Sequence, residues 1–331
     1  MEPIQLWQAK WSHGLYVPMY LFFGGLTSGV YAVAVLTDWL GIKWHRADTV
    51  SKVATYTSIV ALGLSGFFLT IHLGKPERGL AFPIFFTNYD SWITRGGWIV
   101  GISTIFVGLY VLLRYFGITS WLRRLVGLIG LPVLTMLAIY TGLLLSHAGF
   151  VPLWSKQFLP VLFLNSGMTT GVAAVGLMFL LTWPFLKEPD GDPRRVVRWM
   201  SLAVVVLILL EGYELYQFMT SLAASGGAQQ VPTGQFVAPK GGAQAYAYVT
   251  QGALAPWFWW GIIGVGLGIP LLLTIVEFIV SPWARVVATA KFAMILVGGA
   301  ILRFVIVWGG DLKAPLPFPP SKWPIPPVTG G

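Results

Sequence analysis

The sequence predicts an all-α integral membrane protein with eight transmembrane helices, in which four helices are followed by four related ones. Hydrophobic residues make up 56% of the 331 residues and charged residues only 10%, whereas ordinary soluble domains carry about 25% charged residues. Eight runs of mainly apolar residues are long enough to cross a bilayer as helices. A string of twelve residues in the first run also resembles one in the fifth.

The predicted helices follow the apolar runs in order. Their approximate limits are 15–39, 53–72, 96–115, 125–146, 159–185, 197–220, 254–280 and 286–308. The first run is too long for the apolar part of a signal peptide, and the preceding stretch "MEPIQLWQAKW" contains Glu2 and several polar residues. No secretory signal is therefore expected.

The resemblance between the first and fifth runs predicts an internal repeat. "GLTSGVYAVAVL" begins at Gly25, and "GMTTGVAAVGLM" begins at Gly167. With eight spans both strings enter the membrane from the same side, so the repeat would be parallel, with four helices in each half. Both strings also contain Gly-x-x-x-Gly, a pattern that lets helices approach closely. The two interpretations are compatible.

The distribution of Lys and Arg predicts the orientation. Loops after spans 1, 3, 5 and 7, with the adjacent helix ends, carry 12 of these residues, and the opposite side carries 9. The positive-inside rule then places both termini outside. The outer side also has the longer connections, including 85–98, 146–160 and a loop from about 221 to 253. Chemistry or partner docking is therefore expected on the outside.

Several classes of site are disfavoured by composition. The protein has no cysteine, so it cannot hold an iron–sulfur cluster on thiolates or form a disulfide. Of its four histidines, His72 and His147 end spans 2 and 4 rather than lying at membrane depth, which disfavours a haem between transmembrane histidines. No histidine spacing indicates a metal site. The net charge of +9 is spread over several loops and forms no nucleic-acid-binding module.

Ionisable residues inside the predicted spans are candidates for function. A charge inside a bilayer costs roughly 2.5–3.5 kcal/mol and usually faces other helices or a wet cavity. Glu211 and Glu214 lie in the outer half of span 6, and Arg303 lies in the outer half of span 8. They could pair to fix helix packing, or the carboxylates could relay protons to a site outside. A packing role with snorkelling side chains is expected near the inner interface for Asp38, Glu277 and Lys291.

Two further features lie at the predicted outer surface. The segment "HLGKPERGL" places Lys75, Glu77 and Arg78 beside His72 in a sequence with few charges. It could be a helix end turned by Pro76, with an arginine bound to phospholipid. Tyr140 lies about two turns before the outer end of span 4. Because a buried tyrosine hydroxyl needs a partner, it could serve helix packing or donate to a ligand carbonyl.

These segments resemble the NrfD/PsrC family, the membrane subunit of polysulfide-reductase-type complexes. The resemblance covers spans 1 to 5 well and spans 6 to 8 loosely. The matching strings are "GGLTSG", "HLGKPERG", "SWITRGGW", "YTGLLLSHAGFVPLW" and "LPVLFLNSGMTTG". It implies eight helices in two four-helix bundles, which here would be 1–147 and 148–308, followed by a Pro-rich outer tail at 309–331. It also implies no haem, iron–sulfur cluster or metal in this subunit.

The resemblance further implies a quinone site near the periplasmic surface of the bacterial or archaeal cytoplasmic membrane. Electrons would pass between menaquinone or ubiquinone and a ferredoxin-like iron–sulfur subunit on that side. A catalytic subunit, with molybdopterin as one candidate cofactor, would complete the complex. The protein alone would then be a non-autonomous part of a respiratory oxidoreductase. An ion- or proton-translocating subunit and a purely structural anchor are the alternatives.

Individual residues are carried over only where the strings match. The quinone-contacting tyrosine of the family matches Tyr140, and its histidine motif matches His72, Pro76 and Arg78. The family's Asn and His early in span 1 are replaced here by Val17 and Tyr20, which leaves the second quinone partner open between His72 and Tyr20, with His13 or the "SHAG" segment as further candidates. Histidine titrates near neutral pH and suits proton acceptance from a quinol.

Overall fold

The protein is a bundle of long helices. The computed structural model describes residues 14–40, 47–72, 88–148, 151–185, 193–224, 241–279 and 284–311. Among these residues, eight helices are long and apolar enough to cross a membrane, which confirms an all-helical, multi-pass membrane protein. The spans are α2 (Tyr16–Leu40), α3 (Ala47–His72), α6 (Trp92–Tyr115), α7 (Ser120–Ser146), α8 (Leu159–Thr182), α9 (Pro193–Ala224), η2 (Trp257–Gly268) continued by α11 (Ile269–Ile279), and α12 (Ala284–Trp308).

Several helices extend beyond the apolar runs that predict them. Helix α3 begins six residues before the predicted limit of 53, because Asp48, Ser51 and Lys52 belong to its first turns although they are polar. A further, shorter helix, α10 (Gly242–Thr250), lies in the connection predicted as a loop. The seventh span begins as a π-helix, η2, before it continues as α11. Short 3₁₀ turns, η1 (Trp183–Phe185) and η3 (Gly309–Asp311), follow α8 and α12.

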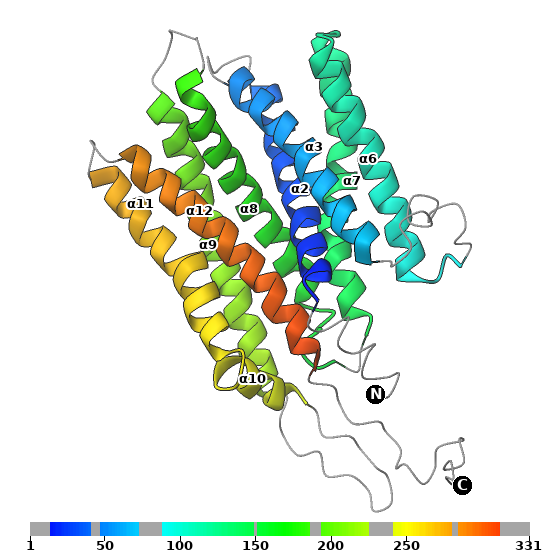
Figure 1. Ribbon diagram of the computed structural model, residues 1–331, viewed down its shortest axis with the longest axis vertical. Coiled ribbons are helices and arrows are strands. Elements are labelled where there is room, and N and C mark those ends of the chain that lie inside the picture. The colour runs from blue at the N-terminus through cyan, green and yellow to red at the C-terminus, as the bar shows by residue number, and fades with distance from the viewer. Residues whose placement is uncertain are drawn as a thin grey trace, which may run out of the picture.

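Helices α2 and α8 occupy the middle of the molecule (Figure 1). Helix α2 packs against α3, α7 and α8, and α6 packs against α3 and α7. On the other side, α8 packs against α9 and α12, and α12 packs against η2 and α11. We call the end where α2 begins and α7 ends the Tyr140 end. The opposite end, where α2 ends and α3 begins, is the Asp38 end.

Close contact between α2 and α8 depends on glycines in the two similar strings. A Cβ atom added at Gly171 would overlap the backbone of Gly29, and one added at Gly167 would lie 2.8 Å from the carbonyl oxygen of Gly25. Since these positions carry no side chain, the two backbones meet directly. The packing interpretation of the Gly-x-x-x-Gly pattern is therefore confirmed.

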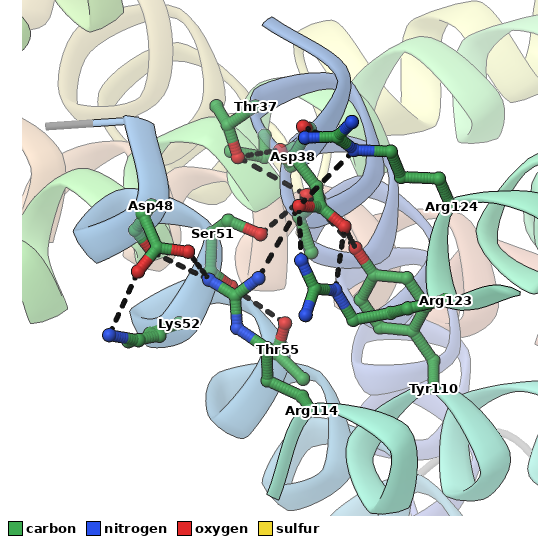
Figure 2. A network of polar contacts seen from close by, with 12 residues as sticks. Thr37, Asp38, Asp48, Ser51, Lys52, Thr55, Tyr110, Arg114, Arg123 and Arg124 are labelled. Carbon is green, nitrogen blue, oxygen red and sulfur yellow. Dashed lines mark hydrogen bonds and ion pairs between the residues drawn. The ribbon is translucent and has the colours of Figure 1, made fainter. Parts of the chain in front are cut away.

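A buried ionic cluster joins the helices of the first half at the Asp38 end (Figure 2). Asp38 is only 3% exposed. Arg123 binds its carboxylate in a bidentate manner, with Nε to Oδ2 at 2.8 Å and Nη2 to Oδ1 at 2.7 Å. The Tyr110 hydroxyl donates to Oδ2 at 3.1 Å. Arg114 links this carboxylate, at 3.4 Å from Oδ1, to Asp48 Oδ1 at 2.6 Å.

The cluster therefore holds α2, α3, α6 and α7 together through the buried pairs of Asp38 with Arg114 and Arg123 and through the partly exposed Arg114–Asp48 pair. The snorkelling expected for the three ionisable residues near the inner interface is wrong, because their side chains are buried. Asp38, Glu277 and Lys291 are 3%, 4% and 0% exposed, so none of them extends to the surface. Asp38 pairs with Arg123, and Glu277 pairs with Lys291, so that none of these buried charges is left uncompensated.

Candidate functional site

Two tyrosines from different helices meet at the Tyr140 end. Tyr20 lies in the second turn of α2, and Tyr140 lies near the end of α7. Their side chains are 4% and 3% exposed. The two hydroxyl groups lie beside each other, close enough for a side-chain hydrogen bond. The structure thus brings together two of the residues that the sequence singles out separately.

Neighbouring helices fix this tyrosine pair. A Cβ atom added at Gly96 of α6 would overlap the Tyr140 ring and hydroxyl, so glycine at that position makes room for the phenol. On α3, the Ser65 hydroxyl donates to the backbone carbonyl of Tyr20 at 3.2 Å. Four helices therefore contribute to the pair: α2 and α7 supply the phenols, α6 supplies space, and α3 supplies a tether.

The histidines lie at the rim of this end. His72 is the last residue of α3, two turns or about 10 Å beyond Ser65 along the helix axis. His147 follows the last residue of α7, and its exposed ring lies 6.2 Å from that of Trp92. Both positions agree with the prediction that histidines end spans 2 and 4. Arg78, with the rest of "LGKPERGL", lies outside the described residues, as does His13.

Two of the predicted relay residues, Glu211 and Arg303, form a second buried group between α8, α9 and α12, and the third, Glu214, is partly buried. Glu211 is 5% exposed, lies beside Ser166 and Thr169, and interacts electrostatically with Arg303. Arg303 is 1% exposed, and its Nη2 donates to the carbonyl of Phe163 at 3.0 Å. Its guanidinium also lies 3.8 Å from the centre of the Phe163 ring.

Several polar atoms of this group have no hydrogen-bond partner within the described ranges: Arg303 Nε and Nη1, Glu214 Oε2 and Ser166 Oγ. Glu214 lies beside Asn165 and interacts electrostatically with Glu211. Buried polar atoms usually find partners in protein or ordered water. The group is therefore suited to holding water or exchanging protons, beyond fixing the packing of helices.

The tyrosine pair suits a ligand that accepts hydrogen bonds. Each phenol has one O–H donor. When the two hydroxyls share a hydrogen bond, one O–H is used in the pair, and the other remains free to donate to a third group such as a carbonyl oxygen. The buried position makes such a bond stronger than it would be in water. The pair therefore offers one free donor, which fits one carbonyl oxygen of a ligand.

Sequence reasoning missed Gly96 and Ser65 as supporting residues. The string "SWITRGGW" can be recognised as a motif from the sequence. Only the structure shows that its Gly96 leaves space for the Tyr140 ring of α7. Ser65 lies on a buried face of α3 that also carries Ser51, Thr55 and Ser58, and a serine within a helix can equally bond its own helix. A buried serine in a span is a weak signal that could have been followed.

The fold and site together define an integral membrane protein with a buried phenol pair at one end and a buried charged group nearby. The family model "Polysulphide reductase, NrfD" matches residues 6–314, and the protein belongs to this family. It is similar to the C subunit of polysulfide reductase from Wolinella succinogenes, with 26% identity over 320 residues covering 89% of this sequence and 93% of that protein.

The protein is also similar to protein NrfD of Escherichia coli, with 26% identity over 325 residues covering 89% of this sequence and 94% of that protein. A homolog of NrfD in Haemophilus influenzae is 24% identical over 322 residues, which cover 89% of this sequence and 93% of that protein. The match along almost the whole sequence confirms the resemblance expected from the sequence strings.

Proposed function

We propose that the protein is the quinone-reactive membrane subunit of a polysulfide-reductase-type respiratory complex. It exchanges electrons and protons between menaquinone or ubiquinone and an iron–sulfur partner subunit. Family membership supports the type of complex. The observation that carries the quinone site is the buried Tyr20–Tyr140 pair, which offers a hydrogen-bond donor at one end of the first four spans.

In this proposal, the quinone head group lies between the outer ends of spans 1 to 4. Tyr140 donates to one carbonyl, and Tyr20 or His72 interacts with the other. Gly96 supports the site because it leaves the space that the Tyr140 ring occupies. His72, at the end of α3, accepts or delivers a proton. Arg78 stabilises negative charge on the head group or docks an acidic partner.

We further propose that the protein is built from two four-helix bundles related by a parallel repeat, 1–147 and 148–308, with an outer tail at 309–331. The contacts support this division. Helices α2, α3, α6 and α7 contact one another in a closed ring, as do α8, α9, the η2–α11 span and α12. The similar strings also meet at the crossing of α2 and α8, where Gly25 and Gly29 face Gly167 and Gly171.

Glu211, Glu214 and Arg303 are proposed to relay protons near the quinone site. Arg303 is adjacent to the first half, since a Cβ atom added at Gly25 would lie 3.4 Å from its Nη2 atom. The two carboxylates interact with each other. Proton-relay groups inside membranes are commonly carboxylates that face the bundle interior.

The Tyr140 end is proposed to face the periplasm, with both termini on that side and the protein in the cytoplasmic membrane. The partner would be a ferredoxin-like iron–sulfur subunit with a catalytic subunit, for which molybdopterin is one candidate cofactor. Without cysteine, this subunit depends on such a partner for cluster-based electron transfer.

Gentle detergent purification of the assembled complex tests this function. We expect a cluster-bearing subunit to co-purify and quinone-dependent turnover to fall in Tyr140→Phe and His72→Ala variants. The distal reaction, measured with an artificial donor that bypasses the quinone, should remain. Recovery of the protein by itself, or wild-type quinone turnover in both variants, would contradict the proposal and favour a purely structural anchor.

A further inference from the structure

The ionic cluster at the Asp38 end holds more positive than negative charge. Asp38 is shared by three arginines, and Asp48 by an arginine and a lysine. Within the part of the sequence that the structure describes, two carboxylates therefore face four cations: Lys52, Arg114, Arg123 and Arg124. The cluster keeps a surplus of two positive charges, and the quinone site proposed above does not use it.

The sequence next to the cluster adds positive charge and no carboxylate. The connection between α2 and α3, "GIKWHR" at 41–46, contains Lys43 and Arg46, and the turn between α6 and α7, "FGIT" at 116–119, contains no charged residue. In the second half, the connection between α8 and α9 instead carries Glu188, Asp190 and Asp192 before the arginines of α9. The unbalanced charge at the Asp38 end is therefore larger in the first half than in the second.

Arg124 is the member of the cluster with unused hydrogen-bond donors. Its Nε atom donates to the backbone carbonyl of Asp38 at 3.2 Å and lies 3.9 Å from Asp38 Oδ1. Among the described residues, its two Nη groups bind no acceptor, although the side chain is only 24% exposed. Figure 2 shows Arg124 on the opposite side of Asp38 from Arg114. A guanidinium with free N–H groups suits an anion with several acceptor oxygens, such as a phosphate group.

The position of Arg124 on α7 places it at the level of lipid headgroups. Helix α7 begins at Ser120, so Arg124 lies about one turn inside the span. Trp121, Leu125 and Leu128 are exposed and lie on the same side of α7 as Arg124, at intervals of three or four residues. Exposed tryptophans mark the boundary between membrane and water. A phosphate bound to Arg124 would therefore have an exposed apolar strip of α7 directly beside it.

We propose that the Asp38 end of the first half binds an anionic phospholipid. A phosphate of its headgroup accepts hydrogen bonds from the Arg124 Nη groups, and its acyl chains lie along the strip formed by Trp121, Leu125 and Leu128. The surplus of two positive charges favours a headgroup with two phosphates. A free phosphate ion would meet the same guanidinium but could not use the apolar strip. Basic sites between transmembrane helices are known to hold such headgroups. The site lies at the opposite end from the phenol pair and goes beyond the proposed quinone function.

Native mass spectrometry of the purified, delipidated full-length protein measures this binding. The protein in detergent is titrated with cardiolipin, which carries two phosphates, with phosphatidylglycerol, which carries one, and with phosphatidylcholine, which has no net charge. Each unbalanced basic residue near a phosphate strengthens binding about fivefold. We expect cardiolipin to bind roughly 25-fold more tightly than phosphatidylcholine, with phosphatidylglycerol between them. Inorganic phosphate at millimolar concentration should not displace cardiolipin.

Substitution of Arg124 locates the site. Arg124→Gln removes one positive charge and the free Nη groups, so we expect cardiolipin affinity to fall about fivefold and phosphatidylcholine affinity to stay the same. Arg124→Lys keeps the charge and should lose less. Arg195→Gln is the matched control, because this exposed arginine lies at the same end on α9, and it should bind cardiolipin like the wild type. Helix content and unfolding temperature without lipid establish that each variant is folded.

A measurement on the wild-type protein needs no variant. Cardiolipin with a photoactivatable acyl chain should label α7 between Trp121 and Leu128, and excess unmodified cardiolipin should suppress the labels. Labels confined to other helices would overturn the site. Equal affinities for cardiolipin and phosphatidylcholine, displacement by inorganic phosphate, or wild-type cardiolipin binding by Arg124→Gln would also overturn it.

The lipid site and the quinone site fail separately. Tyr140→Phe should lower quinone turnover in the assembled complex and leave cardiolipin binding intact. Arg124→Gln should weaken cardiolipin binding and leave quinone turnover intact, because Arg124 lies at the opposite end of α7 from Tyr140. Loss of cardiolipin binding in Tyr140→Phe would contradict a site confined to the Asp38 end.

Discussion

At the scale of single residues, the proposed quinone site depends on the Tyr20 and Tyr140 hydroxyls acting as one unit. Because their hydroxyl groups adjoin, loss of one O–H should weaken the function of the other. A net hydrogen bond contributes about 0.5–1.5 kcal/mol, so each single phenylalanine substitution should weaken quinone binding roughly two- to twelvefold.

A double-mutant cycle measures this coupling. The Tyr20→Phe and Tyr140→Phe single variants and the double variant are compared by titrating turnover of the assembled complex with quinone. We expect the double variant to lose less affinity than the sum of the two single losses, as is found for residues in direct contact. Additive losses, or no loss, would show that the hydroxyls do not form one binding unit.

Asp38 tests the structural role assigned to the ionic cluster. Asp38→Asn would leave the buried guanidinium of Arg123 without its carboxylate. Breaking a buried ion pair typically costs about 3–5 kcal/mol, so thermal unfolding in detergent should occur at a clearly lower temperature. Asp48→Asn is the matched control, since the Asp48 side chain is 57% exposed. Equal unfolding temperatures for the two variants would contradict this role.

At the scale of elements, the packing of α6 on α7 sets the position of Tyr140. Gly96→Ala would place a methyl group in the space of the Tyr140 ring, so we expect quinone affinity to fall together with some stability. Gly108→Ala on the same helix has no atom within 4 Å of the added Cβ and should affect neither. Quinone titration of both variants decides the matter, and identical affinities would mean that Gly96 does not position the phenol.

The spans could be predicted from sequence because a helix that contacts lipid or the protein interior along its length needs a long run of apolar residues, and this run is visible in the hydropathy. Helix ends could not, because Asp48, Ser51 and Lys52 are polar but remain helical through hydrogen bonds and ion pairs with their neighbours. The nine-residue helix α10 was missed, since it has no long apolar run to mark it. The distortion of η2 was missed because a π-helix has the same apolar composition as an α-helix.

The site was predictable only in part. Tyr140 was identified from its position in span 4 and from the family resemblance, and Tyr20 from that resemblance, but their proximity depends on how α2 and α7 pack, which no short motif encodes. The roles of Gly96 and Ser65 require knowledge of which atoms face them across helices. The snorkelling expected for Lys291 was wrong because residues far apart in sequence, Glu277 and Ser201, provide partners inside the protein.

At the scale of the whole molecule, the two ends differ in chemistry. The Asp38 end carries the arginine cluster (Figure 2), and the Tyr140 end carries the phenol pair. The positive-inside rule assigns the first to the cytoplasm. Because the protein has no cysteine, single cysteines can test this orientation without background.

We expect a membrane-impermeant maleimide, added to spheroplasts, to label Lys156→Cys at the Tyr140 end and to leave Arg195→Cys unlabelled until the membrane is opened. Both wild-type side chains are exposed, so burial would not explain a difference. The reverse labelling pattern would place the phenol pair on the cytoplasmic side.

The central claim is that a quinone binds among the ends of the first four spans, beside Tyr20 and Tyr140. The most direct measurement is photo-crosslinking with an azido-quinone, followed by mass spectrometry of the labelled peptides. We predict adducts near the start of α2, the end of α3, the start of α6 and the end of α7, which excess unmodified quinone suppresses. Suppressible adducts confined to the Asp38 end or to α9–α12, or none at all, would contradict it.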